Sequence, residues 1–393
     1  MFKKRIFKNL LCFSNLVTIG SLFISCGNKR VETQKEDIKE NSDINKDKTE
    51  EKEVKSTLTN IENFSLIRIG HWNVLNQTGK SEWKNEAIAK IVQSQNMSLV
   101  GLTEITIDDE TKEKAVSEII KKLKEYEPNA DWSYILSPKL FGKGRESQQE
   151  YIGIIYKNKL LEPIPFAGYN QNKNIYMGIP YENPEFISEF SGKKIVYARP
   201  PFGAKFRVKN DKKNDFTVIF SHFDSPSNSA SKGEGKASGF SGQGEFEVSE
   251  ALQLVEVLKW FDEKDETNDD IFFMGDTNIK TKNGAKAFAP SLKKGYKTLI
   301  DWDLKTSLGK RKKWSEPYDK MIYKGDIETS KADRFDIFKV FENGILNEKE
   351  WKNKLEQDGK NPKNDTLLDW VNKISDHTMT YVDLNVFNED VDE

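Results

Sequence analysis

Four continuous apolar runs constrain this fold more than any other feature of the sequence. They read SLIRIGHWNVL, MSLVGLTEI, FTVIFSHFD and DDIFFMGD. Short apolar runs of this kind are typical of strands buried in a sheet. Helical patterns such as EWKNEAIAKIVQSQN and EFEVSEALQLVEVLKWFDEK lie between them. Strands separated by helices predict sheets that are covered by helices, which places the chain in the α/β class.

The N-terminal region is predicted to lie outside the folded domain. Basic residues, then an apolar stretch from Leu10 to Ile24, precede Ser25 and Cys26. This resembles a bacterial lipoprotein signal over residues 1–25, with Cys26 as the lipidated residue; an uncleaved anchor helix is the alternative. Either arrangement predicts that the body of the protein is outside the cytoplasm, on the outer face of the cell membrane or secreted.

Residues 26–62 are predicted to form a flexible charged tether, because they contain almost no aromatic residues to offset the entropy of ordering. No internal repeat and no second linker interrupts the rest, so we predict one folded domain over residues 63–393. The loop at 225–245 is rich in Gly and Ser. It is typical of a surface loop, and closing over substrate or binding an ion is the alternative.

The overall charge gives little guidance to the partner. The chain has 61 Lys and Arg against 63 Asp and Glu, so no strong field draws it toward nucleic acid. A bound cation can nevertheless bridge an acidic site to a phosphate, so a nucleic-acid substrate is not excluded. Removal of the signal and lipidation of Cys26 would leave no cysteine for a disulfide.

Polar residues end several of the predicted strands, where a sheet would bring them together. The five are Asn73, Glu104, His222, Asp276 and Asn278. Carboxylates, amides and imidazoles at converging strand ends are typical of a metal or proton-transfer site. Asp376 and His377 precede the last strand in the same way. The third histidine, His71, is interpreted as structural, on the face opposite Asn73.

The order of these motifs resembles the endonuclease/exonuclease/phosphatase superfamily. The resemblance spans roughly residues 66–387 and depends on WN, a strand-ending Glu, Arg-Pro, SHFDSP, GDTN, YDKMI and SDH, at 72–73, 104, 199–200, 221–226, 275–278, 318–322 and 375–377. HWNVLN, SGQGE and the lipoprotein signal resemble its mycoplasma-type membrane nuclease branch. The family fold is a four-layer α/β sandwich of two packed, mainly antiparallel or mixed sheets flanked by helices.

The resemblance implies hydrolysis of a phosphate ester with Mg²⁺, with Mn²⁺ or an additional Ca²⁺ left open. Glu104 would be the main metal carboxylate, assisted by Asn73, with Asp376 near the same metal. Asp276 and Asn278 would hold the attacking water and phosphate oxygens. His222 and His377 would flank the phosphate. This arrangement suits phosphoryl transfer, because catalysis of that reaction depends mainly on positioning and on stabilisation of charge.

Partners for these histidines follow from the same resemblance. Asp319 of YDKMI is expected to pair with His377, and Glu150 with His222, although Glu146 is a competitor. Arg199 is predicted to bind phosphate, since a planar guanidinium suits phosphate oxygens. Arg145 is predicted to contact a nucleic-acid backbone.

The implied substrate is DNA, with RNA as an alternative, and the membrane would be reached through the lipid anchor. Thr106 stands where deoxyribonuclease-type members carry a DNA-contacting Arg, which leaves strand preference open. A sphingomyelinase or an inositol-phosphate phosphatase on the same metal core is a rival reading. A non-catalytic surface lipoprotein is a third. The sequence does not indicate the oligomeric state.

Overall fold

The computed structural model describes residues 66–106, 108–169, 177–210, 212–227, 234–309 and 313–390. The predicted signal at 1–25, the lipidation residue Cys26 and the tether at 26–62 lie outside these residues, as does part of the 225–245 loop. The described residues belong to one compact unit. Within that part of the chain, no helix has the length and apolarity to cross a membrane.

The first of two large sheets brings the two ends of the domain together. Its strand order is β14-β16-β1-β2-β4-β3, with β15 also paired to β16. β1 and β2 are parallel, and β16 and β4 flank them in antiparallel orientation. The bounds are β1 Leu66–Gln77, β2 Leu99–Ile105, β3 Trp132–Leu136, β4 Tyr151–Lys157, β14 Glu328–Thr329, β15 Asp333–Arg334 and β16 Thr380–Asn385.

The second sheet repeats this arrangement. Its order is β12-β13-β11-β10-β9-β5, with β6 also paired to β9. β10 and β11 are parallel, and β13 and β9 flank them in antiparallel orientation. The bounds are β5 Leu161–Ile164, β6 Ile179–Pro180, β9 Phe202–Val208, β10 Asp215–His222, β11 Ile271–Asp276, β12 Lys297–Thr298 and β13 Asp319–Lys324; a separate hairpin pairs β7 Glu185–Ile187 with β8 Lys194–Val196.

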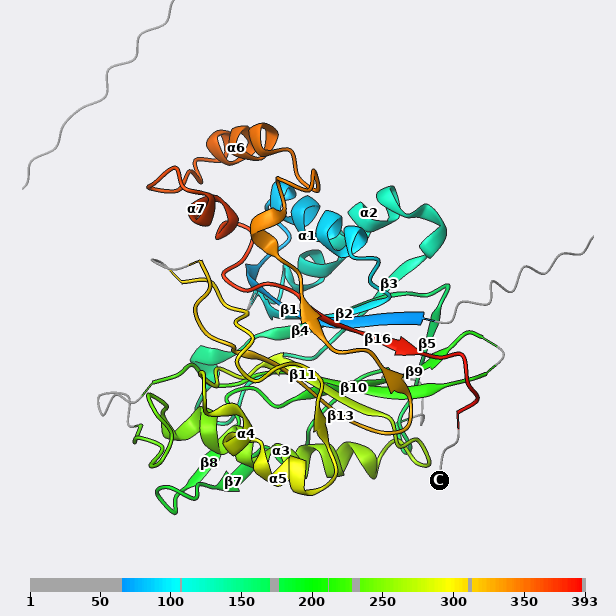
Figure 1. The fold of residues 1–393 in the computed structure, drawn as a ribbon, viewed down its shortest axis with the longest axis vertical. Coiled ribbons are helices and arrows are strands. Elements are labelled where there is room, and N and C mark those ends of the chain that lie inside the picture. The colour runs from blue at the N-terminus through cyan, green and yellow to red at the C-terminus, as the bar shows by residue number, and fades with distance from the viewer. Residues whose placement is uncertain are drawn as a thin grey trace, which may run out of the picture. The chain divides into compact units, whose positions relative to one another are not determined.

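Helices cover the outer face of each sheet, giving four layers (Figure 1). The first sheet is covered by α1 Glu82–Ser94, α2 Lys112–Tyr126, α6 Glu348–Gln357 and α7 Leu367–Val371. The second is covered by α3 Glu245–Asp262, α4 Gly284–Ala287 and α5 Ala289–Lys293. The predicted fold class, an α/β sandwich of two mixed sheets flanked by helices, is confirmed.

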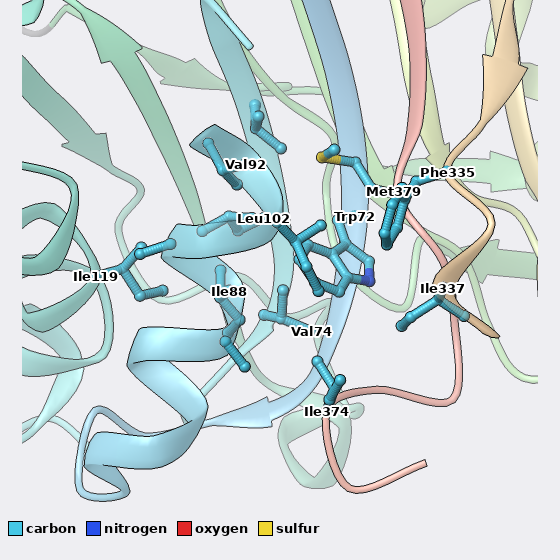
Figure 2. Close-up of a cluster of buried hydrophobic side chains, with 14 of the residues drawn as sticks. Trp72, Val74, Ile88, Val92, Leu102, Ile119, Phe335, Ile337, Ile374 and Met379 are labelled. Carbon is cyan, nitrogen blue, oxygen red and sulfur yellow. The ribbon is translucent and has the colours of Figure 1, made fainter. Parts of the chain in front are cut away.

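Alternation along the strands separates the core into layers. In β1, Ile67 and Ile69 join the cluster between the two sheets, whereas Trp72 and Val74 pack on the other side. Figure 2 shows Trp72 and Val74 against side chains of α1, including Ile88. A third cluster lies between the second sheet and α3. Successive side chains of a strand point to opposite faces, so both faces of each sheet are buried.

The run KKIVYARPPF at residues 193–202 has the pattern of one continuous strand in the sequence, and that interpretation is wrong. β8 ends at Val196, and β9 begins only at Phe202. Pro200 and Pro201 lack the backbone N–H that a ladder requires, so the chain between the two strands takes another course. This break places Arg199 in a connecting segment.

The two sheets are in close contact at a glycine. A Cβ at Gly101 of β2 would lie within 2.5 Å of three ring carbons of Phe220 in β10. Only a residue without a side chain therefore fits opposite this ring. The contact fixes the separation of the sheets a few residues from their polar edge.

Candidate active site

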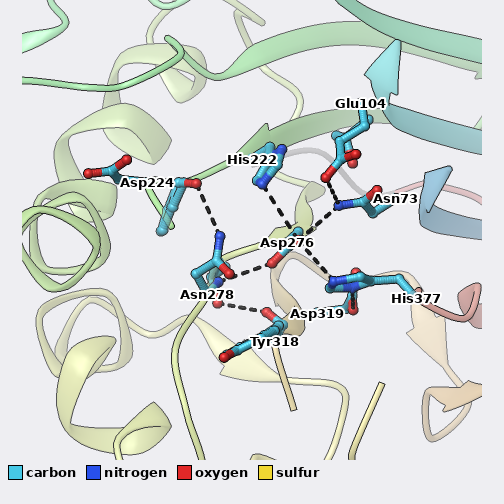
Figure 3. Close-up of polar contacts among 12 residues, drawn as sticks. Asn73, Glu104, His222, Asp224, Asp276, Asn278, Tyr318, Asp319 and His377 are labelled. Atoms are coloured by element: carbon cyan, nitrogen blue, oxygen red, sulfur yellow. Dashed lines mark hydrogen bonds and ion pairs between the residues drawn. The ribbon is translucent and has the colours of Figure 1, made fainter. Parts of the chain in front are cut away.

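The polar side chains predicted from the strand ends gather at one edge of the sandwich (Figure 3). Parallel strands end at the same edge of a sheet, so β1 with β2, and β10 with β11, each deliver neighbouring ends. Strands that run antiparallel to these begin at the same edge. The segments that precede β4 and β16, and the first residue of β13, therefore also lie there. The residues delivered in this way are Asn73, Glu104, Glu150, His222, Asp276, Asp319, Asp376 and His377.

Asp276 is the centre of the group. Its Oδ2 accepts a hydrogen bond from Asn73 Nδ2 at 3.0 Å. The Nε2 atoms of His377 and His222 lie 3.4 and 3.6 Å from the same oxygen. The other oxygen, Oδ1, accepts the backbone N–H of Asn278 at 3.1 Å. Four contacts therefore fix one nearly buried carboxylate between strands of both sheets.

His377 carries a carboxylate at its other ring nitrogen. Its Nδ1 lies 2.8 Å from Asp319 Oδ2, which is the pairing that the resemblance implies. Burial alone would lower the pKa of His377, but the carboxylates of Asp276 and Asp319 outweigh it and raise the pKa well above the usual value. Conversely, despite its burial, the pKa of Asp319 is lowered by the charge of His377. The pair is therefore ionised, with Nε2–H directed toward Asp276.

His222 is held in the same manner by Glu150. Its Nδ1 lies 3.1 Å from Glu150 Oε1, and Arg199 Nε donates to that oxygen at 2.6 Å. Burial and Arg199 lower the pKa of His222, but Glu150 and Asp276 outweigh them and raise it. The competitor Glu146 is exposed and accepts a hydrogen bond from the backbone of Gly144.

Glu104 and Asp376 form an acidic corner beside Asp276. Burial raises the pKa of Asp376, and the charges of Glu104 and Asp276 add to this effect, although His377 opposes it. Asp376 Oδ1 is buried, and among the described residues it has no hydrogen-bond partner. Asn73 joins the acids, since its Nδ2 also donates to Glu104 Oε1 at 2.9 Å.

These residues fit a divalent cation. Mg²⁺ takes one or two carboxylates and completes its shell with water and substrate oxygens. Glu104 and Asp376 supply that donor set, and the unpaired oxygen of Asp376 lacks the positive partner that a buried carboxylate requires. Asn73 donates amide N–H groups to the carboxylates, and its Oδ1 accepts a hydrogen bond from the backbone N–H of Leu75. Asn73 therefore holds the acidic corner in position.

The backbone around this corner is strained. Leu75, Asn76, Glu104 and Asn278 all have φ between 49° and 58°, a left-handed conformation that side chains rarely adopt. The pairing of β1 with β2 is also irregular between Asn73 and Gln77. Such residues cost free energy and cluster at functional sites, where the surrounding structure holds them in place. In this conformation Glu104 Oε2 accepts a hydrogen bond from Asn76 N–H at 3.0 Å.

Sequence reasoning missed Lys84 of α1. Its side chain is buried, and its Nζ donates to the carbonyl of Leu75 in the strained segment. Burial lowers the pKa of Lys84 to about 8, although Glu104 and Asp376 oppose the shift. In the sequence Lys84 is an ordinary helix residue, so no local signal marks it.

The interpretation of His71 as pointing away from Asn73 is wrong. Residues two positions apart in a strand share a face, and His71 lies with Asn73 on the side facing the second sheet. Its Nδ1 is 3.1 Å from Asp319 Oδ1, and its Nε2 is 3.1 Å from Thr103 Oγ1. Asp319 is thus held between two histidines.

The two predicted phosphate-binding arginines differ in position. Arg199 lines an open pocket of about 490 Å³ together with Glu104, Glu150 and His222. Arg145 lines a neighbouring pocket instead. There it forms a 3.0 Å ion pair with Asp224 and lies over the ring of Phe246. Thr106 also lines the first pocket.

This geometry defines a two-sheet α/β protein with a carboxylate and histidine centre at the strand ends. No family model matches the chain. An uncharacterized protein of Mycoplasma pneumoniae is 33% identical over 145 residues, which are 37% of this chain and 30% of that protein. The match therefore spans less than a third of the relative's length.

The chain is similar to solved structures of endonuclease/exonuclease/phosphatase family proteins, the superfamily that its motifs resemble. One from Bacteroides thetaiotaomicron shares 14% identity at a TM-score of 0.46, covering 81% of this chain and 94% of that one. The mannosyl-6-phosphatase Bt3783 of the same species shares 13% identity at a TM-score of 0.46, and the match covers 81% of this chain and 99% of that one. TDP2 of D. rerio, complexed with a single-strand DNA product, shares 13% identity at a TM-score of 0.46, and the match covers 82% of this chain and 100% of that one.

Proposed function

We propose that the protein is a metal-dependent hydrolase of phosphodiester bonds and that nucleic acid is its substrate. The observation that carries the proposal is the convergence on Asp276 Oδ2 of Asn73 and of two histidines. Each histidine holds a carboxylate at its other nitrogen. This arrangement provides a base flanked by two proton donors, which suits attack of water on a phosphate.

In the proposed reaction the phosphate lies over Asp276. Water attacks phosphorus in line with the leaving oxygen and loses its proton to Asp276. The raised pKa values of His222 and His377 favour protonated imidazoles, whose Nε2–H groups donate to the phosphate oxygens. The phosphorus–oxygen bond to the 3′ oxygen breaks, and that oxygen takes a proton from a histidine, leaving a 5′-phosphate.

The chemistry that Mg²⁺ or Mn²⁺ supplies at Glu104 and Asp376 is neutralisation of the charge that develops on the phosphate. The protein's part is to hold these two carboxylates next to Asp276. Asn73 positions Glu104 by donating to both Glu104 and Asp276, and Asp376 Oδ1 has no hydrogen-bond partner among the described residues. Arg199 fixes Glu150, and its place in the open pocket supports contact with a phosphate.

Digestion of plasmid DNA tests the proposal. The purified full chain should nick and linearise supercoiled plasmid with Mg²⁺ and leave it intact with EDTA. Glu104→Gln is expected to lower cleavage about a hundredfold, the scale for losing one group that stabilises transition-state charge. Glu146→Gln is the matched control, because this exposed residue lies in the nearby loop and should leave cleavage unchanged. DNA left intact with both Mg²⁺ and Mn²⁺ would refute a DNA nuclease.

Other substrates separate the rival activities. Single-stranded DNA and RNA digested at equal protein concentration establish strand and sugar preference. Release of phosphocholine from sphingomyelin vesicles, or of phosphate from inositol polyphosphates, without cleavage of any nucleic acid would identify a different phosphoesterase. Identical behaviour of wild type and Glu104→Gln on every substrate would indicate a non-catalytic surface protein.

We also propose that a lipid on Cys26 anchors the chain to the outer face of the membrane, with residues 26–62 as a tether. The lipoprotein-like signal in the sequence supports this placement. Detergent phase separation of cell extracts tests it, since Cys26→Ser should move the chain from the detergent phase to the aqueous phase. A wild-type chain already in the aqueous phase would contradict the anchor.

A further inference from the structure

A second group of carboxylates lies at the opposite end of β11 from the candidate active site. Asp269 and Asp270 directly precede β11, whose last residue is Asp276, and Asp326 lies in the turn after β13. One oxygen from each of the three lies within 4.8 Å of the others. We call these three the distal carboxylates. A six-residue strand rises about 20 Å, so they are separate from the acids around Asp276.

Asp270 is the buried member of this group. Its Oδ1 accepts hydrogen bonds from the hydroxyl of Tyr323 and from the backbone N–H of Ile327, the latter at 3.0 Å. Its Oδ2 is completely buried and has no hydrogen-bond partner among the residues that the structure describes. Burial raises the pKa of Asp270 to about 8, and the charges of Asp326 and Asp269 add to the effect. Burial of such an oxygen costs free energy unless a proton or a cation is bound to it.

The backbone is adapted to bring the turn close to Asp270. Gly325, next to Asp326, has φ 141°, which only glycine adopts readily. A Cβ at this position would clash with Asp270 Oδ1 and Cγ. The turn therefore lies directly against the buried carboxylate, and Asp326 follows it at the exposed side.

We propose that the distal carboxylates bind one divalent cation, Ca²⁺ in preference to Mg²⁺. Ca²⁺ accepts irregular sets of oxygen ligands at about 2.3–2.6 Å, so two ligands on opposite sides of the ion lie roughly 4.8 Å apart. The observed spacing of the three oxygens suits such a shell. Mg²⁺ demands a near-ideal octahedron and retains several waters, which a completely buried oxygen does not favour.

The bound ion would join the start of β11 to the turn after β13. These strands pair along their length, from Ile271 opposite Lys324 to Asp276 opposite Asp319. The cation would thus stabilise the end of the strand pair remote from the active site. This role is structural, and it does not depend on the proposed nuclease activity.

Thermal unfolding of the full chain tests the site. In wild type, Ca²⁺ at about a hundredfold excess over its Kd should raise Tm by roughly 4 °C relative to EDTA. Asp326→Asn changes an exposed side chain and should fold, but it should lose this rise. Glu342→Gln, an exposed carboxylate in another turn, should keep it.

A Glu104→Gln background separates this site from the active site. The Ca²⁺-induced rise in Tm should persist there, because Glu104 belongs to the other end of the strands. No rise in wild type, or an equal rise in Asp326→Asn, would overturn the proposal. An equal rise with Mg²⁺ that Asp326→Asn abolishes would overturn the preference for Ca²⁺. None of these measurements uses cleavage, so a failed nuclease assay would not affect them.

Discussion

Replacing Gly101 by Ala tests whether the separation of the two sheets positions the active site. Gly101 lies three residues before Glu104 in β2, and Phe220 lies two residues before His222 in β10. The new methyl group would lie within 2.5 Å of three ring carbons of Phe220. An ordinary contact between carbon atoms is about 3.5 Å or more. The ring or the sheets must therefore move by roughly 1 Å.

The expected loss of stability follows from this overlap. Overpacking of a core costs about 1–3 kcal/mol. Unfolding entropy near 2.1 cal/mol/K per residue, over roughly 330 residues of the compact unit, gives about 0.7 kcal/mol/K. Gly101→Ala should therefore lower Tm by only about 1–4 °C. Activity should fall much further, about tenfold or more, because a displacement near 1 Å separates Glu104 from His222.

Scanning calorimetry and plasmid cleavage at 25 °C measure the two effects on the same samples. Phe220→Leu removes the ring that the methyl group meets, so the double variant should lose less stability than the sum of the single variants. A Gly101→Ala chain with wild-type Tm and wild-type cleavage would refute the argument that this contact sets the sheet spacing. Additive losses in the double variant would show that the methyl group and the ring do not meet.

Three further predictions concern the buried charges. His71→Phe should lower kcat about three- to tenfold with KM nearly unchanged, because Asp319 loses the nitrogen 3.1 Å from its Oδ1; unchanged steady-state kinetics would contradict this. The raised pKa of His377 means that its pairing contributes stability that is fully present below about pH 6.5 and is lost as pH rises through the folded-state pKa. In urea unfolding with EDTA, the free energy of unfolding should therefore decline less from pH 6 to pH 9 in His377→Gln than in wild type. An equal decline in the two proteins would contradict the raised pKa of His377. Burial raises the pKa of Glu247 from 4.5 to about 8, so its ionisation costs the folded state stability as pH rises through that window. The change in the free energy of unfolding caused by Glu247→Gln should accordingly be about 1–3 kcal/mol more favourable at pH 8 than at pH 5. Equal changes at both pH values would refute this prediction.

The strand ends could be predicted from the sequence because each carries a local signal. An apolar run that stops at Glu104, His222 or Asp276 is visible without knowledge of the fold. Parallel pairing then brings such ends to one edge, which is a general property of sheets. The four-layer architecture came from the resemblance, since periodicity alone does not specify how two sheets pack.

Contacts between distant segments carried no such signal. The order β16-β1-β2 places the last strand beside the first, and only this pairing brings His377 to Asp276. Lys84 reaches the strained carbonyl of Leu75 from a helix surface that looks ordinary in the sequence. The misplacement of His71 was a different kind of error, because the alternation of a strand already assigned it to the face of Asn73.

The repeated layout of the two sheets explains why the site is built from pairs. Each sheet has a central parallel pair of strands flanked by antiparallel ones, so β1, β16 and β4 correspond in position to β11, β13 and β9. Each of these three pairs of strands, or the segments leading into it, contributes one polar contact across the sandwich. These contacts are Asn73 to Asp276 at 3.0 Å, His377 to Asp319 at 2.8 Å and Arg199 to Glu150 at 2.6 Å. The hydrogen bonds that hold the proposed catalytic groups are therefore among those that join the two sheets at this edge. Any change that separates the sheets weakens all three contacts together, which is why activity should respond to sheet packing before global stability does.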